Sequence, residues 1–345
     1  MTPHGFQHTV LCWHELHGRK NLPWQTPNDP YRVWVSEIML QQTQVVTVRG
    51  YFEAFMHRFP NLESLAAAQP EEVLSIWAGL GYYARARNLH QCARTLIDKH
   101  GGKFPTEQKS LEALPGIGRS TAGAILSLSL GQRAAILDGN VRRLLTRYFR
   151  IPGWPGDPKV QSRLWTLSES LVPERHPGTF NQALMDLGSL VCTPRRPSCG
   201  DCPLETGCGA RADGTQGLYP EKKPPRPKPV RESYFLILRR SGGSYYLETR
   251  AETGIWGGLL CLPEFRTLEA LKEWLSSNKI ESHDMVKLAS RRHTFTHFHL
   301  DFIPILSDIG SRWPESLLAT GSFVSQERLE RLPAPIHHLL SSIEA

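Results

Sequence analysis

Hydrophobic side chains recur every three or four residues in the first two thirds of the chain, and a different spacing follows. Residues 141–148 and 180–191 have apolar positions at the spacing of helices with one buried face. Farther along, the apolar runs 234–238 and 244–247 are typical of strands, and residues 268–275 again have a helical pattern. We therefore expect a mostly α region followed by a smaller α+β domain, with no internal repeat.

A proline-rich segment separates the two patterns. Residues 220–229 contain five prolines, which break helix interiors and cannot donate to a strand ladder. This segment should be an extended, partly stiff linker. At 345 residues the chain is long enough for two cores. We expect a helical domain over residues 1–218, a linker over 219–230 and a second domain over 231–345.

Basic charge is concentrated before the linker. The formal net charge of +7 divides into +8 for residues 1–230 and −1 for the rest. This balance favours a polyanion as partner of the first part, although basic soluble proteins are common. Glycine and serine interrupt the longest apolar run, residues 122–130, so no membrane span is expected. The N-terminus has no apolar signal stretch, and we expect an intracellular protein.

One carboxylate stands among the apolar residues of a predicted helix. Asp29-Pro30 is a typical helix start, with a capping side chain followed by proline. Glu37 lies beyond the first turn, and Val33 and Trp34 lie one turn away. Apolar surroundings raise the pKa of a carboxyl group, as a general acid near neutral pH requires. A partly exposed glutamate or a buried ion pair would fit the same sequence.

A short proline–glycine turn precedes a second carboxylate. Gly116 and Gly118 predict a tight turn whose N–H groups can hold a phosphate without reading sequence, or that simply joins two helices. Twenty residues later, Asp138 is expected to cap a helix and to keep a low pKa. With Glu37 protonated and Asp138 ionised, one group can donate a proton while the other stabilises positive charge, as in glycoside hydrolysis.

Four of the seven cysteines are grouped. Cys192, Cys199, Cys202 and Cys208 fall within 17 residues. An odd count without a secretory signal argues against a disulfide framework and for a local metal site. Four thiolates suit tetrahedral zinc and equally a [4Fe–4S] cluster, and the residues alone leave both open.

Together these features resemble one known family. The proline–glycine turn, Asp138 about twenty residues later and the 6-2-5 spacing of the four cysteines are similar to those of helix-hairpin-helix glycosylases with a [4Fe–4S] cluster. Residues 34–45, 79–88 and 137–143 resemble the MutY-type adenine DNA glycosylases, which remove adenine mispaired with 8-oxoguanine. The resemblance implies a helical glycosylase domain with a cluster loop at 192–208 and a Nudix-like domain. It also implies a monomer in the cytoplasm or nucleoid that acts on duplex DNA with A:8-oxoguanine or A:G mispairs.

The resemblance also implies roles for particular residues. Glu37 would protonate the adenine ring, Asp138 would stabilise the cationic sugar, and Asn140 would position the water and the sugar. The target base must first leave the stack. Gln42 and Tyr82 match positions that wedge into the duplex. Positions that line the adenine pocket are matched by Trp24, Leu40, Val45 and Gln182. Positions that contact DNA at the proline–glycine turn are matched by Gly116, Gly118 and Ser120.

Ser120 decides between two reaction types. In bifunctional relatives similar to endonuclease III, a lysine after the hairpin attacks the sugar as an amine nucleophile. Serine forms no Schiff base, so we expect hydrolysis of the glycosidic bond with little or no strand cleavage.

The domain after the linker resembles the Nudix fold but lacks the acidic run that binds magnesium in the hydrolases of that fold. Phe295-Thr296-His297 matches the family's Phe-Ser-His loop, which senses 8-oxoguanine, with threonine in place of serine. We therefore expect a recognition module. His293 and His299 alternate with His297 as on a strand, which leaves a metal site as a rival interpretation.

Three other functions fit part of these features. A bifunctional pyrimidine glycosylase/lyase would belong to the same superfamily. A non-catalytic, metal-bearing DNA-binding protein would account for the basic part and the cysteines alone. A Nudix-type nucleotide hydrolase is disfavoured because the acidic run is missing.

Overall fold

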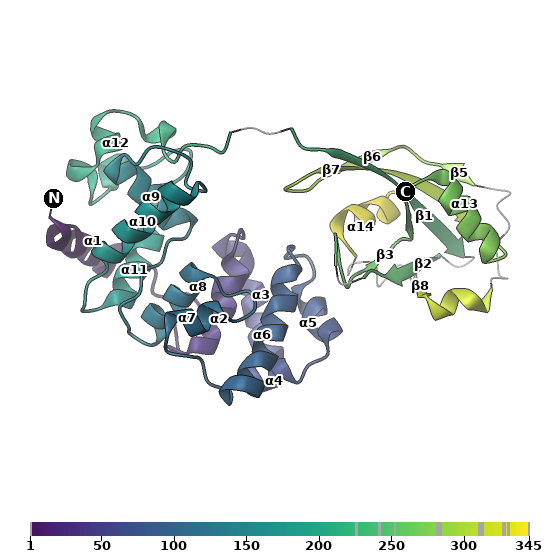
Figure 1. Ribbon diagram of the computed structural model, residues 1–345, viewed down its shortest axis with the longest axis horizontal. Helices are drawn as coiled ribbons and strands as arrows, with labels where there is room; N and C mark the ends of the chain where they lie inside the picture. The colour runs from purple at the N-terminus through teal and green to yellow at the C-terminus, as the bar shows by residue number, and fades with distance from the viewer. Residues whose placement is uncertain are drawn as a thin grey trace. The chain divides into compact units, whose positions relative to one another are not determined.

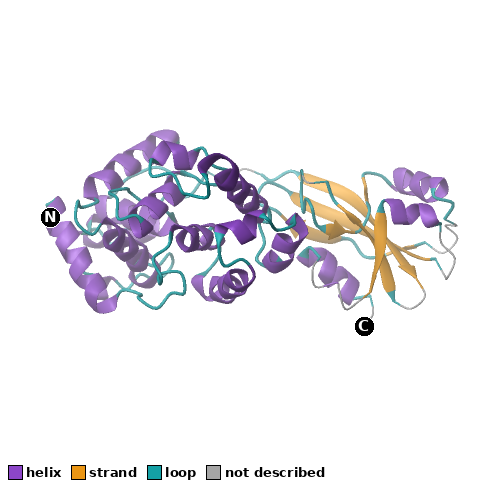
Figure 2. Cartoon of the chain, turned by 90° about the horizontal axis from the view of Figure 1, so that it is seen from below, coloured by secondary structure: helices purple, strands orange, loops and turns teal. Residues whose placement is uncertain are grey.

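The chain folds into two compact units in the computed structural model. The helical unit comprises Met1–Gln69 and Arg85–Pro224, and the sheet unit comprises Pro70–Ala84 and Pro225–Ala345. The described strands all belong to the sheet unit, which also contains helices (Figure 2). The structure describes residues 2–224, 227–240, 243–251, 253–280, 285–309, 314–325, 329 and 332–343. Residues 225 and 226 of the predicted linker lie outside this set.

Helices joined by short loops form the helical unit, as the apolar periodicity predicts (Figure 1). The α-helices are α1 (Pro3–His17), α2 (Pro30–Leu40), α3 (Val45–Arg58), α4 (Leu62–Ala66), α6 (Ala84–His100), α7 (Gln108–Glu112), α8 (Arg119–Ala124), α9 (Gly139–Phe149), α10 (Pro158–Leu171), α11 (Pro177–Asp186) and α12 (Gly209–Ala212). Two of them continue as π-helical turns, α8 into η1 (Ile125–Ser129) and α11 into η2 (Leu187–Val191). Short 3₁₀ turns, η3 (Cys199–Asp201), η4 (Glu205–Gly207) and η5 (Gln216–Leu218), lie in and after the cysteine loop.

Aspartate side chains begin three of these helices. Asp29 Oδ1 accepts a hydrogen bond from the Tyr31 N–H at 3.1 Å, and Pro30 takes the first helical position of α2, as predicted. Asp157 caps α10 in the same way, and Asp138 caps α9. These caps set the first residue of α2 and of α9. They therefore also set where along each helix its functional groups lie.

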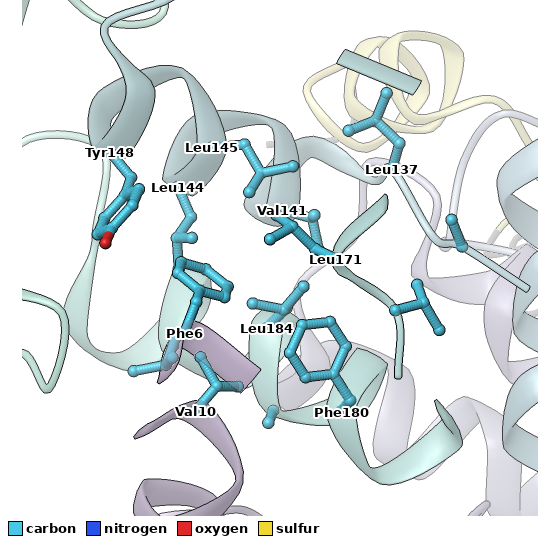
Figure 3. Packing of buried hydrophobic residues seen from close by; sticks show 14 of the residues in the cluster. Phe6, Val10, Leu137, Val141, Leu144, Leu145, Tyr148, Leu171, Phe180 and Leu184 are labelled. Atoms are coloured by element: carbon cyan, nitrogen blue, oxygen red, sulfur yellow. The ribbon is translucent and has the colours of Figure 1, made fainter. Parts of the chain in front are cut away.

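Helices α1, α9 and α11 pack around a shared apolar core (Figure 3). Phe6 of α1 meets Tyr148 of α9 edge-on at 5.0 Å between ring centroids, and it lies 6.4 Å from the ring of Phe180 on α11. Gly123 permits a further close approach, because a Cβ there would lie 2.0 Å from the Ala135 carbonyl oxygen. This approach brings the hairpin helix α8 against the segment that leads to Asp138.

A mixed sheet forms the centre of the sheet unit. Its main strand order is β3-β2-β1-β7-β5, with β4 paired to β1, β6 to β7 and β8 to β2. The long strands β1 and β7 pair in parallel, with Val230 opposite His299 and Arg239 opposite Asp308. The elements are α5 (Pro70–Trp77), β1 (Val230–Arg240), β2 (Ser244–Thr249), β3 (Leu260–Cys261), β4 (Glu264–Phe265), α13 (Leu268–Ser277), β5 (Val286–Lys287), β6 (Arg291–Thr294), β7 (His299–Asp308), η6 (Glu315–Ala319), β8 (Gly321–Ser325) and α14 (Ala334–Ser341).

Both faces of this sheet are buried, which explains the uninterrupted apolar run in β1. Phe235 and Ile237 belong to a core shared with α14, whereas Leu236 and Leu238 belong to a core shared with α13. The predicted fold class, a mostly α part followed by a smaller α+β part, is confirmed. None of the helices in the described ranges combines the length and apolar character that a membrane span requires.

Candidate active site and cysteine cluster

Glu37 lines a pocket in the helical unit. The pocket has a volume of about 330 Å³, and Glu37 lies on α2 between the fully buried Ser36 and Ile38. Burial and, to a smaller extent, the charge of Asp138 raise the pKa of Glu37 to about 8. The carboxyl group is therefore protonated at neutral pH, the state that the sequence predicts for a general acid.

Asp138 is held from several sides at the start of α9. Its Oδ1 accepts hydrogen bonds from the Asn140 N–H at 3.0 Å and the Val141 N–H at 2.7 Å. Burial raises its pKa, and the bonds from Val141 and Asn140 and the charge of Arg143 oppose that rise. The prediction of a lowered pKa is wrong, because it took account of the cap and not of the surrounding core. The hydrogen bonds from Asn140 and Val141 are nevertheless donated to the side-chain oxygens of Asp138, which favours the ionised form over the protonated form.

Asn140 connects Asp138 to the cysteine loop. Its Nδ2 donates to Asp138 Oδ2 at 3.0 Å, and its Oδ1 accepts from Arg143 Nη2 at 2.8 Å. The same guanidinium donates through Nε to the carbonyl oxygen of Cys192 at 2.7 Å. The orientation of the Asp138 carboxylate thus depends on a chain of hydrogen bonds that ends at the first cysteine.

Trp24 and Gln182 line the Glu37 pocket, whereas Leu40 and Val45 do not. Leu40 ends α2 and is half-buried, and Val45 lines a separate groove. The residues around the Glu37 pocket come from α1, the following loop, α2, η1 and α11: His14, Arg19, Lys20, Trp24, Gln25, Thr26, Asn28, Val33, Ser36, Glu37, Leu128, Gly178, Thr179 and Gln182.

The two predicted wedge residues share an unusual backbone. Gln42 has φ +58° and Tyr82 has φ +49°, both in the left-handed region that side chains other than glycine rarely adopt. Both side chains are exposed, Tyr82 to 52%. Arg85 supports the turn at Gln42, because its Nη1 donates to the carbonyl oxygen of Gln41 at 2.7 Å. Exposed side chains on such backbone are typical of functional loops.

The proline–glycine turn takes the predicted form. Gly116 has φ +76°, and a Cβ there would lie 2.8 Å from Asn88 Cβ, so glycine is required twice over. Gly118 stands at the N-cap of α8 with no side chain bonded to the first N–H groups. Ser120 Oγ accepts from the Leu137 N–H at 3.2 Å. The hydroxyl at the position of the lyase lysine therefore lies beside the residue that precedes Asp138.

All four cysteines of the loop line one small pocket. Arg147 Nη1 lies 3.3 Å from Cys192 Sγ, and Gln216 Nε2 lies 3.7 Å from Cys199 Sγ. No three His, Cys, Asp or Glu side chains in the described part of the chain are arranged to hold a single metal ion. Burial raises the pKa of Cys202 to about 11 and also raises the pKa of Cys208, so a cationic centre would favour the thiolate form of these two residues.

The predicted lesion-sensing residues form a β-hairpin turn in the sheet unit. The Phe295 N–H donates to the Phe298 carbonyl oxygen at 2.9 Å between β6 and β7, and the two rings stack at 4.8 Å. Thr296 and His297 occupy the tip, and both are exposed. The neighbouring histidines have other contacts: His293 packs edge-on against Phe295, and His299 Nδ1 lies 2.9 Å from Thr294 Oγ1.

Sequence reasoning missed three residues that contact one another: Arg19 and His14 line the Glu37 pocket, whereas Asp186 does not. Asp186 is fully buried and pairs with Arg19, and His14 Nε2 lies 3.7 Å from Asp186 Oδ2. The only local signal was Asp186 one helical turn after Gln182 within an apolar stretch.

Both parts of the chain match known families. Residues 35–170 match the model of the HhH-GPD superfamily base excision DNA repair proteins, and residues 234–342 match that of the NUDIX domain. A thermostable thymine-DNA glycosylase superposes with a TM-score of 0.55 at 29% identity, covering 61% of this chain and 97% of its own. Endonuclease III in a non-covalent DNA complex gives 0.52 at 22% identity, with 63% and 99% covered, which shows a shared fold.

Adenine DNA glycosylases are similar over most of the length. That of Buchnera aphidicola subsp. Schizaphis graminum is 43% identical over 310 residues, which cover 90% of this chain and 89% of that protein. The human enzyme is 45% identical over 215 residues, covering 60% of this chain and 39% of the human protein. The chain therefore belongs to the adenine DNA glycosylase family and is a base-excision repair enzyme that hydrolyses N-glycosidic bonds.

Proposed function

We propose that this enzyme acts as a monomer on duplex DNA and hydrolyses the glycosidic bond of adenine mispaired with 8-oxoguanine or guanine, without cutting the strand. The observation that carries the proposal is the raised pKa of Glu37, about 8, at a pocket lined by Trp24 and Gln182. A protonated carboxyl group facing a base-sized pocket is what departure of a neutral adenine requires.

The chemistry divides between two carboxyl groups. Glu37 donates its proton to a ring nitrogen of the extruded adenine, which makes the base a better leaving group. As the bond to C1′ breaks, positive charge develops on the sugar, and the Asp138 carboxylate stabilises it. Asn140, which already holds Asp138 Oδ2, positions the sugar and the water that adds to C1′. The products are free adenine and an abasic site.

Ser120 supports hydrolysis over strand cleavage. A lyase needs an amine that can form a Schiff base with the sugar. The Ser120 hydroxyl instead accepts a hydrogen bond from the Leu137 N–H beside Asp138. With a hydroxyl there, β-elimination has no nucleophile at this position.

Three features of the two units fit the approach of DNA. The first N–H groups of α8, after Gly116 and Gly118, can hold a backbone phosphate independently of sequence. Gln42 and Tyr82 are exposed on strained turns and would enter the duplex around the mispair while adenine is extruded. In the sheet unit, the hairpin tip at Thr296 and His297 would contact the 8-oxoguanine.

We further propose that Cys192, Cys199, Cys202 and Cys208 hold a [4Fe–4S] cluster. The pocket that all four line, and the Arg147 and Gln216 donors near two of the sulfurs, fit a polynuclear centre held by four thiolates. When bound, the cluster would supply a rigid cross-link within the loop rather than redox chemistry at the base.

The mispair assay tests the reaction. Duplex DNA with adenine opposite 8-oxoguanine is incubated with the wild-type enzyme and with Ser120→Lys, and strand breaks are measured before and after alkali. We expect wild-type breaks after alkali only, and breaks before alkali with Ser120→Lys, which restores an amine. Wild-type breaks without alkali, or no abasic product at all, would contradict the proposal.

Metal analysis tests the cluster. Iron and sulfide at four each per chain and broad absorption at about 400 nm are expected for a [4Fe–4S] centre. One zinc per chain and a colourless protein would contradict it.

A further inference from the structure

The carboxylate of Asp186 is fully buried on the last turn of α11, the helix that also carries Gln182 of the Glu37 pocket. Its Oδ1 accepts hydrogen bonds from Arg19 Nε at 2.8 Å and Arg19 Nη2 at 2.6 Å, and its Oδ2 accepts from the Arg19 N–H at 2.7 Å. His14 Nε2 lies 3.7 Å from Oδ2. This ion pair joins the loop after α1 to α11.

Asp186 also receives the side-chain amide of Gln182, one turn earlier on the same helix. Gln182 Nε2 donates to Asp186 Oδ1 at 2.8 Å. An ionised carboxylate only accepts hydrogen bonds, so the –NH₂ group of Gln182 must face Asp186 and its carbonyl oxygen must face the other way. No described residue donates to that oxygen, and Gln182 lines the pocket together with Glu37.

The polarity of the pocket wall at Gln182 therefore follows from Asp186, a residue that does not itself line the pocket. A carbonyl oxygen can accept a hydrogen bond from the 6-amino group of adenine. The same oxygen opposes the 6-carbonyl oxygen of hypoxanthine or guanine, because two acceptors cannot pair. If the amide were free to rotate, its –NH₂ group could donate to such a carbonyl, and the pocket would lose this discrimination.

We infer that Asp186 is a specificity-determining positioning residue: by holding the Gln182 amide in one orientation, it makes the pocket an acceptor site for a 6-amino purine. This inference rests on the proposed placement of adenine in the Glu37 pocket. Arg19 contributes by neutralising Asp186 and fixing both of its oxygens, which keeps the carboxylate an acceptor in a buried position.

The test compares single-turnover release of adenine and of hypoxanthine, each opposite 8-oxoguanine, by the full-length enzyme. Asp186→Asn offers both a carbonyl oxygen and an –NH₂ group to Gln182, so the Gln182 amide can take either orientation. We expect the adenine-to-hypoxanthine rate ratio to fall about ten- to hundredfold, the cost of one mismatched buried hydrogen bond. Asp157→Asn, which changes an exposed cap of α10, is the matched control and should keep the wild-type ratio.

Further variants separate this role from a structural one. In a Gln182→Ala background the amide is absent, so adding Asp186→Asn should leave the ratio unchanged. Gln182→Ala alone should lower the ratio, and it is informative even if Asp186→Asn does not fold. Equal losses on both bases with Asp186→Asn, or a wild-type ratio with Gln182→Ala, would overturn the inference. A wild-type enzyme that releases no adenine would instead overturn the proposed function.

Discussion

The two units bury different kinds of side chain. Among the described residues, the helical unit buries ionisable groups such as His14, Arg147 and Asp186, whereas the polar side chains buried in the sheet unit are Ser233 and Ser307. Burying a charge destabilises a fold unless the charge is paired. In the helical unit, the buried Asp186 is accordingly paired with Arg19. The sheet unit is built from two apolar faces, and the residues proposed for recognition, Thr296 and His297, lie at an exposed turn.

Replacing Glu37 provides the strongest test of this contrast. Glu37→Gln should reduce base release about 10²- to 10⁴-fold, because the proton donor is lost. In the wild type, the rate should fall as pH rises through about 8, where Glu37 loses its proton. Single-turnover rates measured between pH 6 and pH 9, roughly one unit or more on either side of that pKa, check both outcomes.

The same variant should gain stability at high pH. The folded-state pKa of Glu37, about 8, lies above the ordinary value of 4.5. The protonated group therefore contributes stability that is complete below pH 4.5 and is lost as pH rises through 8. Glutamine has no charge to lose, so Glu37→Gln should melt at a higher temperature than wild type at pH 8 and differ little near pH 5. A lower melting temperature of Glu37→Gln than of the wild type at pH 8 would contradict the raised pKa of Glu37.

Matched core truncations compare the two units directly. Phe180→Ala in the helical unit and Phe302→Ala in the sheet unit each delete a fully buried ring, at a cost of about 3–5 kcal/mol. Hydrogen exchange should accelerate in the peptides of the altered unit. We expect Phe180→Ala alone to slow adenine release opposite unmodified guanine. An equal slowing by Phe302→Ala would show that catalysis depends on the sheet core as well.

The hairpin tip should affect recognition and not chemistry. His297→Ala should lower the preference for 8-oxoguanine over guanine about tenfold, the effect of one lost hydrogen bond, with the rate opposite guanine unchanged. Thr296→Ser keeps the hydroxyl and serves as the control, so its preference should match that of the wild type. The measurement is the ratio of single-turnover rates on the two mispairs. An equal loss on both mispairs would place His297 outside recognition.

Replacing two helix caps, Thr267 and Asp157, should have the smallest effect, a loss of stability without a loss of activity. Thr267 Oγ1 accepts from the Ala270 N–H at 3.1 Å at the start of α13, and Asp157 Oδ1 accepts from the Lys159 N–H at 2.9 Å at the start of α10. Alanine at either position should cost about 1 kcal/mol by chemical denaturation and leave adenine release unchanged. Asp138→Ala removes a cap of the same kind and should abolish release in addition.

The residues with local signals were predictable from the sequence. An aspartate before a proline fixed the start of α2, and apolar neighbours on that helix indicated a raised pKa for Glu37. The cap role of Asp138 followed from its place before an apolar-periodic helix. The prediction of a strand over residues 234–238 is confirmed. A strand buried on both faces is apolar at every position, whereas a surface helix has polar residues on its exposed face.

Features that depend on tertiary packing were not predictable. Arg19 and Asp186 are 167 residues apart, and no local spacing relates them. The pKa of Asp138 was misjudged for the same reason: the cap is visible in the sequence, but the degree of burial is set by distant helices. Leu40 ends the Glu37 helix and Val45 begins the next one, yet neither residue lines the Glu37 pocket.

The hydrogen bonds from Asp138 through Asn140 and Arg143 to the Cys192 carbonyl couple two distant parts of the sequence. Arg143 donates to the backbone of the cysteine loop and to Asn140, which in turn donates to the Asp138 carboxylate. A displacement of the Cys192 carbonyl would therefore remove one acceptor of Arg143 and weaken the support of Asp138. The conformation of the cysteine loop and the orientation of this carboxylate thus depend on each other.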